Sequence, residues 1–387
     1  MIAIAIANNP DFLIADEPTT ALDVTVQAEI LKLIRQLQEQ YHMGVLLITH
    51  DLTIVEKVSD RVAVMRLGKI VETNGTKRLF AAPTHAYTQK LFAAAPSGRP
   101  NPVPAGSNVV LETERLRVEY HLRWGGLFSR QSQLLVAVDD VTLSLKSGET
   151  LGIVGESGSG KTTLGKAILR LLHNDGGTIG WKGERLDTRS KVEMRPLRPS
   201  LQVVFQDPFA SLNPRLSVKQ IIEEGLIVNG LGGNAAQRDK RVRDTLADVG
   251  LDPNTLNRFP HEFSGGQRQR IAIARALAME PDVLVADEAV SALDVSVQAQ
   301  VLSLLGELQE KLGIAILFIT HDLRVAAQIC DDVAVMQEGR IVEYGPAERV
   351  LRAPSEAYTR NLIEAAPGRH WDFANFRPLA AEAPANV

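Results

Sequence analysis

The feature that most constrains this chain is an internal repeat. The segment IADEPTTALDVTVQAEIL at Ile14–Leu31 returns as VADEAVSALDVSVQAQVL at Val285–Leu302, at an offset of 271 residues. The same offset relates four further pairs, namely His50 and His321, Pro83 and Pro354, Tyr87 and Tyr358, and Pro96 and Pro367. No gap interrupts the alignment from Pro10 to Pro96. Two copies of one folding module are therefore expected.

The first copy lacks a front half. At the same offset Met1 corresponds to Ala272, so Leu111–Ile271 of the second copy has no counterpart. Between the copies, Ser97–Asn108 is rich in proline, glycine and small polar residues, which favours an extended connection. We expect a partial module at residues 1–80, an extension at 81–98, a linker at 99–109, a complete module at 110–350, a second extension at 351–368 and a flexible tail at 369–387.

The composition is that of a globular protein and excludes several classes of function. Of the 387 residues, 45% are hydrophobic and 23% are charged, which argues against disorder. The net charge of −4 and the scattered basic residues disfavour a nucleic-acid partner. Cys330 is the only cysteine, which excludes a disulfide framework, a cysteine-rich zinc site and an iron–sulfur cluster. Without an apolar run of about 20 residues, we expect membrane attachment only through partners.

A glycine-rich segment in the second copy has the pattern of a phosphate-binding loop. The apolar stretch LGIVG runs into GESGSGKTT at Gly155–Thr163, which matches GxxxxGK[ST]. Its glycines allow backbone N–H groups to approach phosphate oxygens, Lys161 would neutralise the β- and γ-phosphates, and the Thr162 hydroxyl would contact Mg²⁺. A helix predicted over Thr163–Leu172 would point its positive end at the same phosphates.

Four features later in the sequence are read as functional because this loop is present. Gln206 follows an apolar strand, Ser264 precedes a helix as an N-cap, Asp287 and Glu288 end another apolar strand, and His321 ends a third. Taken singly, each has an ordinary structural explanation: a strand-end polar residue, a capped helix, a solvated strand end or a structural histidine. Adjacent carboxylates after an unbroken apolar strand, however, favour a metal or acid/base site.

Together these segments resemble the nucleotide-binding domain of an ATP-binding cassette (ABC) transporter, with all its motifs in family order. The resemblance implies an α/β fold, the P-loop NTPase fold of ABC ATPases, with a partial second copy. It implies an ATP-binding set of Tyr120, Gly155, Glu156, Ser157, Gly158, Ser159, Gly160, Lys161, Thr162 and Thr163, in which Tyr120 stacks on adenine.

The same resemblance assigns the remaining roles. It gives Glu288, His321 and Gln206 to catalysis and Thr162, Gln206 and Asp287 to Mg²⁺. It identifies Ser264, Gly265, Gly266 and Gln267 as the signature that acts on a partner's ATP, and Ser291 and Asp294 as D-loop residues. Ala289-Val290 departs from the usual Pro-Thr, which Pro18-Thr19 of the first copy retains; we expect altered stiffness in that turn and no lost chemistry.

A narrower resemblance concerns peptide importers. The segments APTHAYTQKLFAAAP at Ala82–Pro96 and APSEAYTRNLIEAAP at Ala353–Pro367 look like the C-terminal extension of dipeptide and oligopeptide importer ATPases, including the fused, microcin C type. The loop Arg123–Arg130 resembles an insertion common in the second ATPase of such importers. This implies integral-membrane permease subunits, a periplasmic binding protein reached through them, and a peripheral location at the cytoplasmic face of the inner membrane.

The first copy keeps Asp16, Glu17 and His50 as vestigial residues, but has no phosphate loop or signature of its own. Three interpretations remain open. The chain is an ATPase whose second copies pair between chains or with a separate fragment, a nucleotide-binding scaffold that does not hydrolyse ATP, or a decayed or mis-started product of a full-length importer ATPase. An exposed sheet is expected around the strand at Asp11–Ala15.

Overall fold

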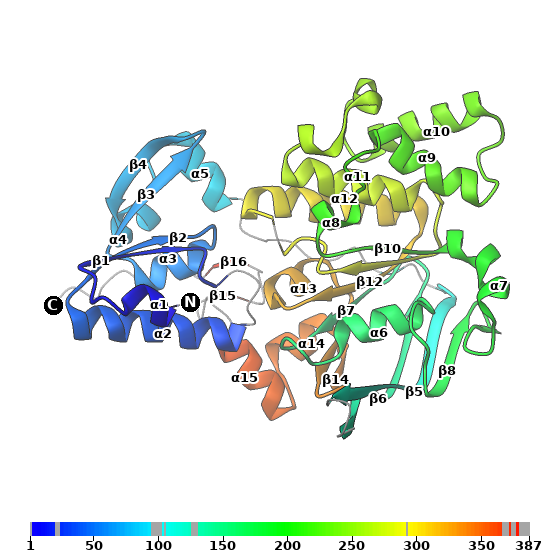
Figure 1. Ribbon diagram of the computed structural model, residues 1–387, viewed down its shortest axis with the longest axis horizontal. Helices are drawn as coiled ribbons and strands as arrows, with labels where there is room; N and C mark the ends of the chain where they lie inside the picture. Colours follow the sequence, from blue (N-terminus) through cyan, green and yellow to red (C-terminus); the bar gives the residue numbers. More distant parts are fainter. Residues whose placement is uncertain are drawn as a thin grey trace.

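The computed structural model describes residues 2–19, 24–93, 103, 106–124, 131–291, 293–365, 371–372 and 377–378. Its largest element is a six-stranded sheet in the second copy, with strand order β10-β11-β12-β7-β13-β14. The first five strands are parallel neighbours and β14 is antiparallel to β13 (Figure 1). The strands are β7 (Thr150–Val154), β10 (Leu201–Val204), β11 (Val283–Asp287), β12 (Ala315–Thr320), β13 (Asp332–Gln337) and β14 (Arg340–Pro346).

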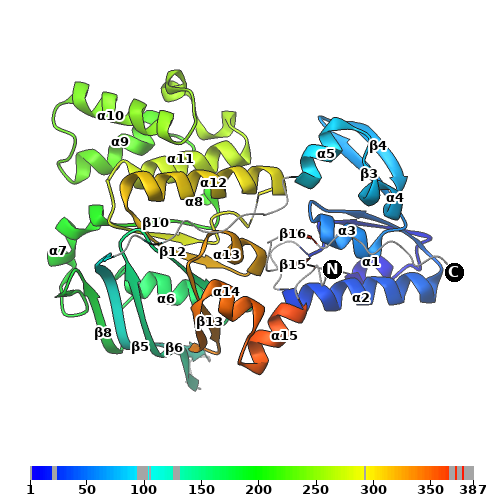
Figure 2. The ribbon, with the colours of Figure 1, turned by 180° about the vertical axis from the view of Figure 1, so that it is seen from behind.

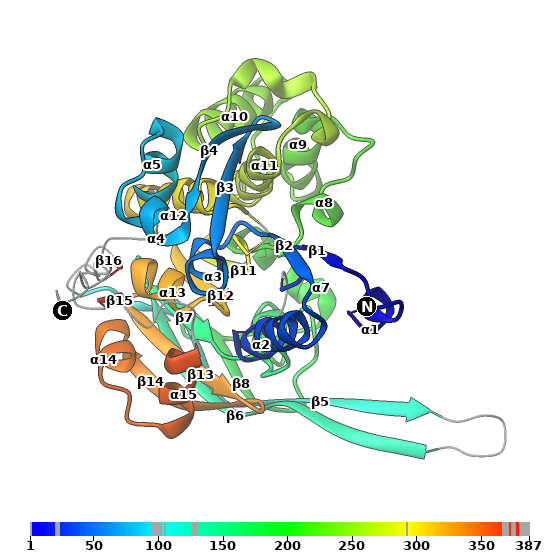
Figure 3. The ribbon, with the colours of Figure 1, turned by 90° about the vertical axis from the view of Figure 1, so that its left-hand side faces the viewer.

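A second, antiparallel sheet of order β6-β5-β8-β9 precedes and flanks it. Its strands are β5 (Val109–Trp124), β6 (Gln131–Lys146), β8 (Gly176–Trp181) and β9 (Glu184–Arg185). Figure 3 shows β5 and β6 projecting together well beyond the sheet. The inserted loop was predicted at Arg123–Arg130, of which residues 125–130 lie outside the described part of the chain.

Helices cover both faces of the six-stranded sheet. The main ones in the second copy are α6 (Lys161–Ile168), α9 (Val218–Val228), α10 (Ala235–Asp248), α11 (Gly265–Leu277), α12 (Val295–Leu312), α13 (Leu323–Ile329), α14 (Ala347–Arg352) and α15 (Ala357–Ala365), with short α7 (Lys191–Met194) and α8 (Pro208–Ser211). The helix predicted at Thr163–Leu172 differs from α6: it begins two residues earlier, because Gly160 is its N-cap, and it ends at Ile168. Leu169–Leu172 instead form tight turns closed by backbone bonds to Gly165, Lys166 and Ala167.

The first copy repeats part of this architecture in two separate sheets, β1-β2 and β3-β4. Its elements are α1 (Ile2–Ile6), β1 (Phe12–Asp16), α2 (Val24–Tyr41), β2 (Gly44–Ile48), α3 (Leu52–Val58), β3 (Arg61–Arg66), β4 (Lys69–Gly75), α4 (Thr76–Ala81) and α5 (Ala86–Ala93). In the second copy, β7 lies between the equivalents of β2 and β3. Within the described part of residues 2–93, no strand takes that place.

The predicted exposure of the first copy's sheet is confirmed. Ile14 of β1 is 61% exposed and Ile48 of β2 is 45% exposed, whereas their equivalents Val285 and Ile319 are 1% and 0% exposed. The difference arises because α6 covers the second copy's sheet: a Cβ at its Gly165 would touch Ile319 and Val285. The same pair of strands is therefore fully buried in one copy and exposed on one face in the other.

The two copies face each other through reciprocal contacts. Helix α5 of the first copy contacts α12 of the second, and α15 of the second contacts α2 of the first. Since α5 is equivalent to α15 and α2 to α12 in the repeat, the two contacts exchange roles. Figure 2 shows α15 at the end of α2. No helix within the described residues is long and apolar enough to cross a membrane. Most of the predicted linker at 99–109 and of the tail at 369–387 lies outside the description.

Candidate active site

The loop between β7 and α6 has the backbone geometry of a phosphate cradle. Gly155 has φ +151° and Gly160 has φ +102°, which side-chain-bearing residues rarely adopt. A Cβ at either position would lie 2.2 Å from a carbonyl oxygen, that of Met336 or Ala137. The glycines are therefore required by the close approach of neighbouring strands as well as by the loop itself. Helix α6 begins at Lys161, so its first N–H groups point towards the loop.

Lys161 lies folded back over the loop. Its Nζ donates hydrogen bonds to the carbonyl oxygens of Gly155 and Glu156, each at 2.7 Å, and approaches Ser159 Oγ at 3.3 Å. Lys161 is only 5% exposed and Ser159 also 5%. The ammonium group is thus already centred on the cradle in which phosphate oxygens would replace the carbonyl contacts.

Thr162 and Asp287 meet across the sheet. The Thr162 hydroxyl donates to Asp287 Oδ1 at 2.9 Å, joining the start of α6 to the end of β11. Burial raises the pKa of Asp287, and the neighbouring charge of Glu288 raises it further, against the lowering effect of the Thr162 bond. A hydroxyl and a carboxylate side by side are oxygen donors of the kind Mg²⁺ prefers, with phosphate oxygens and water to complete the shell. The residues present therefore fit a nucleotide-bound Mg²⁺.

Glu288 is held between two side chains that lie just beyond the ends of β10 and β12. Gln206 Nε2 donates to Glu288 Oε2 at 2.7 Å, and His321 Nδ1 lies 3.4 Å from the same oxygen. Glu288 itself has φ +47°, an uncommon conformation for a residue with a side chain, while its N–H donates to Ile319 O at 2.9 Å. This backbone strain lies where a carboxylate must be aimed into the site.

The charges of this pair are mutually supportive. Burial raises the pKa of Glu288, but the hydrogen bond and charge of His321 outweigh it, and the pKa is lowered overall. Burial lowers the pKa of His321. The hydrogen bond and negative charge of Glu288 raise it by more, so the pKa of His321 is raised overall. Glu288 is thus kept ionised and able to accept a proton or orient water.

These groups open into one cavity of about 460 Å³. Its lining includes Tyr120, the expected adenine partner, together with Gln206, Glu288 and His321. The other lining residues are Leu135, Ala137, Ser157, Gly158, Gly160, Lys161, Thr162 and Thr163. Sequence analysis missed Leu135 and Ala137, which face the cavity because β6 pairs with β5 so that Leu135 lies opposite Tyr120. Gly155, Glu156 and Ser159 shape the loop from behind and do not line the cavity.

The predicted signature residues lie elsewhere. Ser264 caps α11: its Oγ accepts from the Gln267 N–H at 3.4 Å, and Gln267 Oε1 accepts from the Ser264 N–H at 3.0 Å. A Cβ at Gly266 would lie 2.1 Å from Val297 of α12, while Gly265 has no such close contact. None of the four lines the cavity, which is compatible with their predicted action on a partner's nucleotide.

The D-loop residues continue from Glu288. Ser291 Oγ donates to the Glu288 carbonyl at 3.0 Å, and Asp294 caps α12 by accepting from the Val297 N–H at 3.1 Å. Ala289 and Val290, at the departure from Pro-Thr, are each 2% exposed. The strained backbone of the preceding glutamate is nevertheless shared by both copies, with φ +43° at Glu17.

The first copy keeps the same pair of acid and base in a more open setting. His50 Nδ1 lies 3.1 Å from Glu17 Oε1, and the Glu17 N–H donates to Ile48 O at 2.9 Å, as Glu288 does to Ile319. Asp16 ends β1 in register with Ile48, just as Asp287 pairs with Ile319. The Glu17 side chain is 44% exposed, against 17% for Glu288.

One contact to the loop was not anticipated. The N–H of Glu156 donates to the Tyr358 hydroxyl at 3.2 Å, across 202 residues. Tyr358 belongs to α15, in the predicted C-terminal extension, so the extension touches the phosphate loop directly. The signal available in the sequence was the repeat itself, which conserves a tyrosine in both extensions, but nothing in it indicated what the hydroxyl would meet.

Comparison with known proteins shows the family to which the chain belongs. The ABC transporter family model matches residues 138–291, and the model of the oligopeptide/dipeptide transporter C-terminal region matches residues 71–110 and 342–385. The chain is 51% identical, over 94% of its length, to an uncharacterized ABC transporter ATP-binding protein, YejF of Escherichia coli, and covers 68% of that protein. It is 52% identical to the peptidoglycan transport ATP-binding protein YejF of Agrobacterium fabrum, over 95% of this chain and 67% of that one.

Other relatives and solved structures agree. The glutathione import ATP-binding protein GsiA of Salmonella typhimurium is 47% identical over the whole of this chain and 66% of its own length. The structure of cbiO1 from Clostridium perfringens, part of an ABC transporter complex, has a TM-score of 0.55 and 31% identity, over 64% of this chain and 92% of that one. The dimeric structure of an ATP-binding cassette bound to ADP and phosphate has a TM-score of 0.54 and 28% sequence identity, over 61% of this chain and 98% of that one.

The resemblance inferred from the motifs is therefore confirmed, as is the P-loop fold. With relatives about half identical over nearly all of its length, this chain belongs to the ATP-binding proteins of ABC transporters.

Proposed function

We propose that this chain binds and hydrolyses ATP as the energising subunit of an ABC importer for peptides or related solutes. The observation that carries the proposal is the position of Glu288. It is held by Gln206 and His321 in the wall of the cavity that the phosphate loop also lines. An ionised carboxylate, fixed from two sides and facing the place of the γ-phosphate, is what hydrolysis by an activated water requires.

The side chains would divide the work as follows. Tyr120 would pack against the base, and the loop N–H groups with Lys161 would hold the phosphates. Glu288 would orient the attacking water and accept its proton, while His321 and Gln206 keep the carboxylate in place. Lys161 would stabilise the negative charge that develops on the transferring phosphoryl group.

Mg²⁺ would be held by Thr162 and Asp287, with the amide oxygen of Gln206 as a further candidate. When bound, the ion neutralises charge on the β- and γ-phosphates. The raised pKa of Asp287 is compatible with this role, because a cation in contact would favour the ionised carboxylate that burial now disfavours.

The importer assignment rests on the two C-terminal regions that match the oligopeptide/dipeptide transporter model. Relatives named for peptidoglycan transport and glutathione import are consistent with peptide-like cargo. The partners would then be integral-membrane permease subunits, a periplasmic binding protein that selects the cargo, and a second ATPase domain supplying the signature in trans. Such a complex would place the chain peripherally at the cytoplasmic face of the inner membrane.

A non-hydrolysing scaffold is the second candidate. The observation that favours it is the open sheet of the first copy, where Glu17 and His50 are poised without a phosphate loop among the described residues of that copy. In this case the second copy would bind nucleotide, and binding alone would hold the permease complex together.

Two substitutions test the site, and phosphate release by the unsubstituted chain separates the two functions. Lys161→Ala should abolish Mg-ATP binding by the purified chain, and unchanged affinity would refute the site. Glu288→Gln should retain binding and lose phosphate release by about 100-fold or more. If the unsubstituted chain binds Mg-ATP but releases no phosphate at any protein concentration or with purified permease, the scaffold replaces the ATPase as the function.

A further inference from the structure

Two equivalent positions of the repeat touch each other. Arg324 Nη1 donates to Thr53 Oγ1 at 3.4 Å, and these residues are separated by 271 positions, the offset of the repeat itself. Equivalent positions of two copies meet only close to a two-fold axis relating them. The exchanged helix contacts, α5 with α12 and α15 with α2, indicate the same axis. The two copies are therefore related by a pseudo-two-fold that passes near Thr53 and Arg324.

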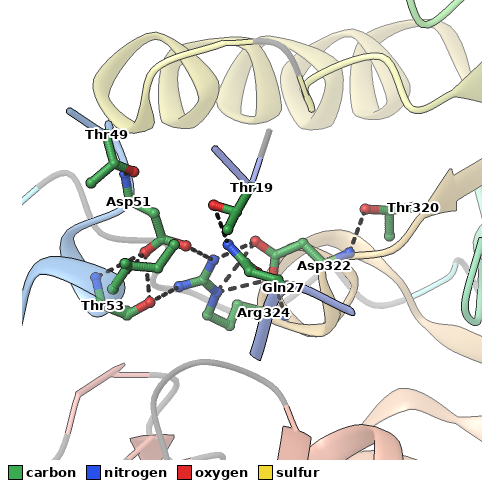
Figure 4. Close-up of polar contacts among 9 residues, drawn as sticks. Thr19, Gln27, Thr49, Asp51, Thr53, Thr320, Asp322 and Arg324 are labelled. Carbon is green, nitrogen blue, oxygen red and sulfur yellow. Dashed lines mark hydrogen bonds and ion pairs between the residues drawn. The ribbon is translucent and has the colours of Figure 1, made fainter. Parts of the chain in front are cut away.

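The residues at this axis are not equivalent in chemistry. Arg324 is held by its own copy through Asp322, with Nε to Oδ1 at 3.0 Å and Nη2 to Oδ2 at 2.8 Å. It also lies 3.7 Å from Asp51 Oδ2 of the other copy. Figure 4 shows the guanidinium between the two carboxylates, with the Thr53 side chain alongside. One cation therefore serves two acidic helix caps, of α3 and α13.

The contact is largely removed from solvent. The Arg324 side chain is 17% exposed and that of Asp51 is 18% exposed. Thr53 Oγ1 accepts from Arg324 and donates to Asp51 Oδ1 at 2.6 Å, so the hydroxyl relays the bond between the two charged groups. A charge-assisted contact at this burial is worth more than an exposed surface ion pair.

We propose that Arg324 and Thr53 act as a specificity pair that makes the first copy pair with the second and disfavours pairing of like copies. The arginine supplies the single cation and occupies the space over the axis; the threonine leaves that space open and relays the bond to Asp51. This preference goes beyond ATP hydrolysis, and its test does not depend on turnover.

Pairing of two second copies in the same geometry would place a second arginine where Thr53 lies. The charges alone would balance, since Asp322 takes the place of Asp51. Arg324, however, reaches across the axis to the position of Thr53 while it is bound to its own Asp322. In a pair of second copies, each arginine would reach across in the same way, and the two guanidinium groups would overlap. Like charges in such proximity add repulsion.

Pairing of two first copies fails for the opposite reason. Two threonines would face each other, and two Asp51 carboxylates would approach the axis without Arg324 between them. The unlike pair is thus the one combination that offers both a cation and the room for it. This favours association within a chain, or with a first copy of another chain, over the pairing of second copies between chains that sequence analysis left open.

The 387-residue chain can be made to present each like pairing at its own axis. Thr53→Arg puts two arginines there, and Arg324→Thr puts two threonines between two aspartates. The combined variant Thr53→Arg/Arg324→Thr restores an unlike pair with the roles exchanged. Hydrogen exchange of α15 reports docking at a distance from the substitutions, because α15 contacts α2 of the first copy.

We expect deuterium uptake in α15 to rise by about tenfold in rate in each single variant, and to return towards the unsubstituted rate in the combined variant. Arg243→Thr, which breaks a surface ion pair on α10, is the matched control and should leave α15 unchanged. Rescue by exchange cannot arise from general misfolding. The proposal would be overturned if deuterium uptake in α15 were unchanged in both single variants. It would also be overturned if uptake in the combined variant rose by the two single effects added together.

Discussion

The side-chain amide of Gln206 lies 2.7 Å from Glu288 Oε2, although 82 residues separate the two in sequence. The contact forms because β10 and β11 are parallel neighbours, paired from Leu201 with Val283 to Val204 with Ala286. Each side chain follows the end of its strand, so both reach the same edge of the sheet. This is the edge at which parallel α/β sheets commonly bind ligands.

Removal of this amide should affect turnover more than binding. Gln206→Ala leaves the phosphate loop intact but frees one side of Glu288. We expect kcat for ATP hydrolysis to fall by about 10–100-fold, with Mg-ATP affinity changed by less than about threefold. Gln202→Ala is the control, because Gln202 on the same strand donates to Arg198 O, away from the cavity. Equal losses in both variants would show that Gln206 acts only through strand stability.

The hydroxyl of Tyr358 should contribute to nucleotide affinity. It accepts a 3.2 Å bond from the Glu156 N–H, and its loss would leave the loop less firmly held. We expect Tyr358→Phe to weaken Mg-ATP binding by about three- to tenfold, as for one neutral hydrogen bond, measured by titration calorimetry. Tyr87→Phe, the equivalent change in the first copy, should have no effect. An unaltered affinity in Tyr358→Phe would confine the extension to a structural role.

The same kind of substitution should destabilise the protein strongly in the second copy and hardly at all in the first. Val285→Glu places a carboxylate in a core position that is 1% exposed, and should lower the free energy of unfolding by at least about 3 kcal/mol. Ile14→Glu, at the equivalent position 61% exposed, should change it by less than about 0.5 kcal/mol. Urea unfolding followed by circular dichroism distinguishes the two. A large loss in Ile14→Glu would mean that another segment covers β1 in solution.

Stability should depend on pH through Asp331. Burial raises its pKa to about 6, and the charges of Glu149 and Asp332 add to the effect. Because the folded pKa exceeds the unfolded value of about 3.9, this group's stabilisation is full below about pH 3.9 and is lost as the pH rises through 6. Asp331→Asn keeps an acceptor for the Thr150 N–H, now 2.8 Å from Asp331 Oδ2, and removes the charge.

We therefore expect Asp331→Asn to be more stable than the unsubstituted chain above pH 6, by about 1 kcal/mol after solvent screening, and to lose that advantage towards pH 4. Thermal unfolding between pH 4 and 8 measures the difference. Asp239→Asn should behave oppositely, because Lys219 and Arg243 lower the pKa of Asp239 and so favour the folded state at higher pH. Parallel pH profiles in the two variants would contradict this assignment.

Much of the candidate site could be predicted because its signals are local. The glycine positions, the Ser264 cap with Gln267 and the buried strand before Asp287 follow from backbone stereochemistry and side-chain periodicity within a few residues. The end of α6 could not, because Leu169–Leu172 turn back onto the last residues of α6, and the carbonyl oxygens of Leu169 and Arg170 accept hydrogen bonds from the distant Arg198. Tertiary packing overrides propensity in such a segment.

By itself the sequence determined that two copies of a module are present, that one carries a phosphate loop and that both carry the adjacent carboxylates. Tertiary structure alone decided that Tyr358 reaches the loop, that Arg324 meets Thr53, and that Ile14 is exposed where Val285 is buried. The physical reason is the distance along the chain over which each kind of interaction acts. Motifs depend on torsion angles and spacing along the chain, whereas burial and charge pairing depend on which distant surface covers a residue once the sheets have formed.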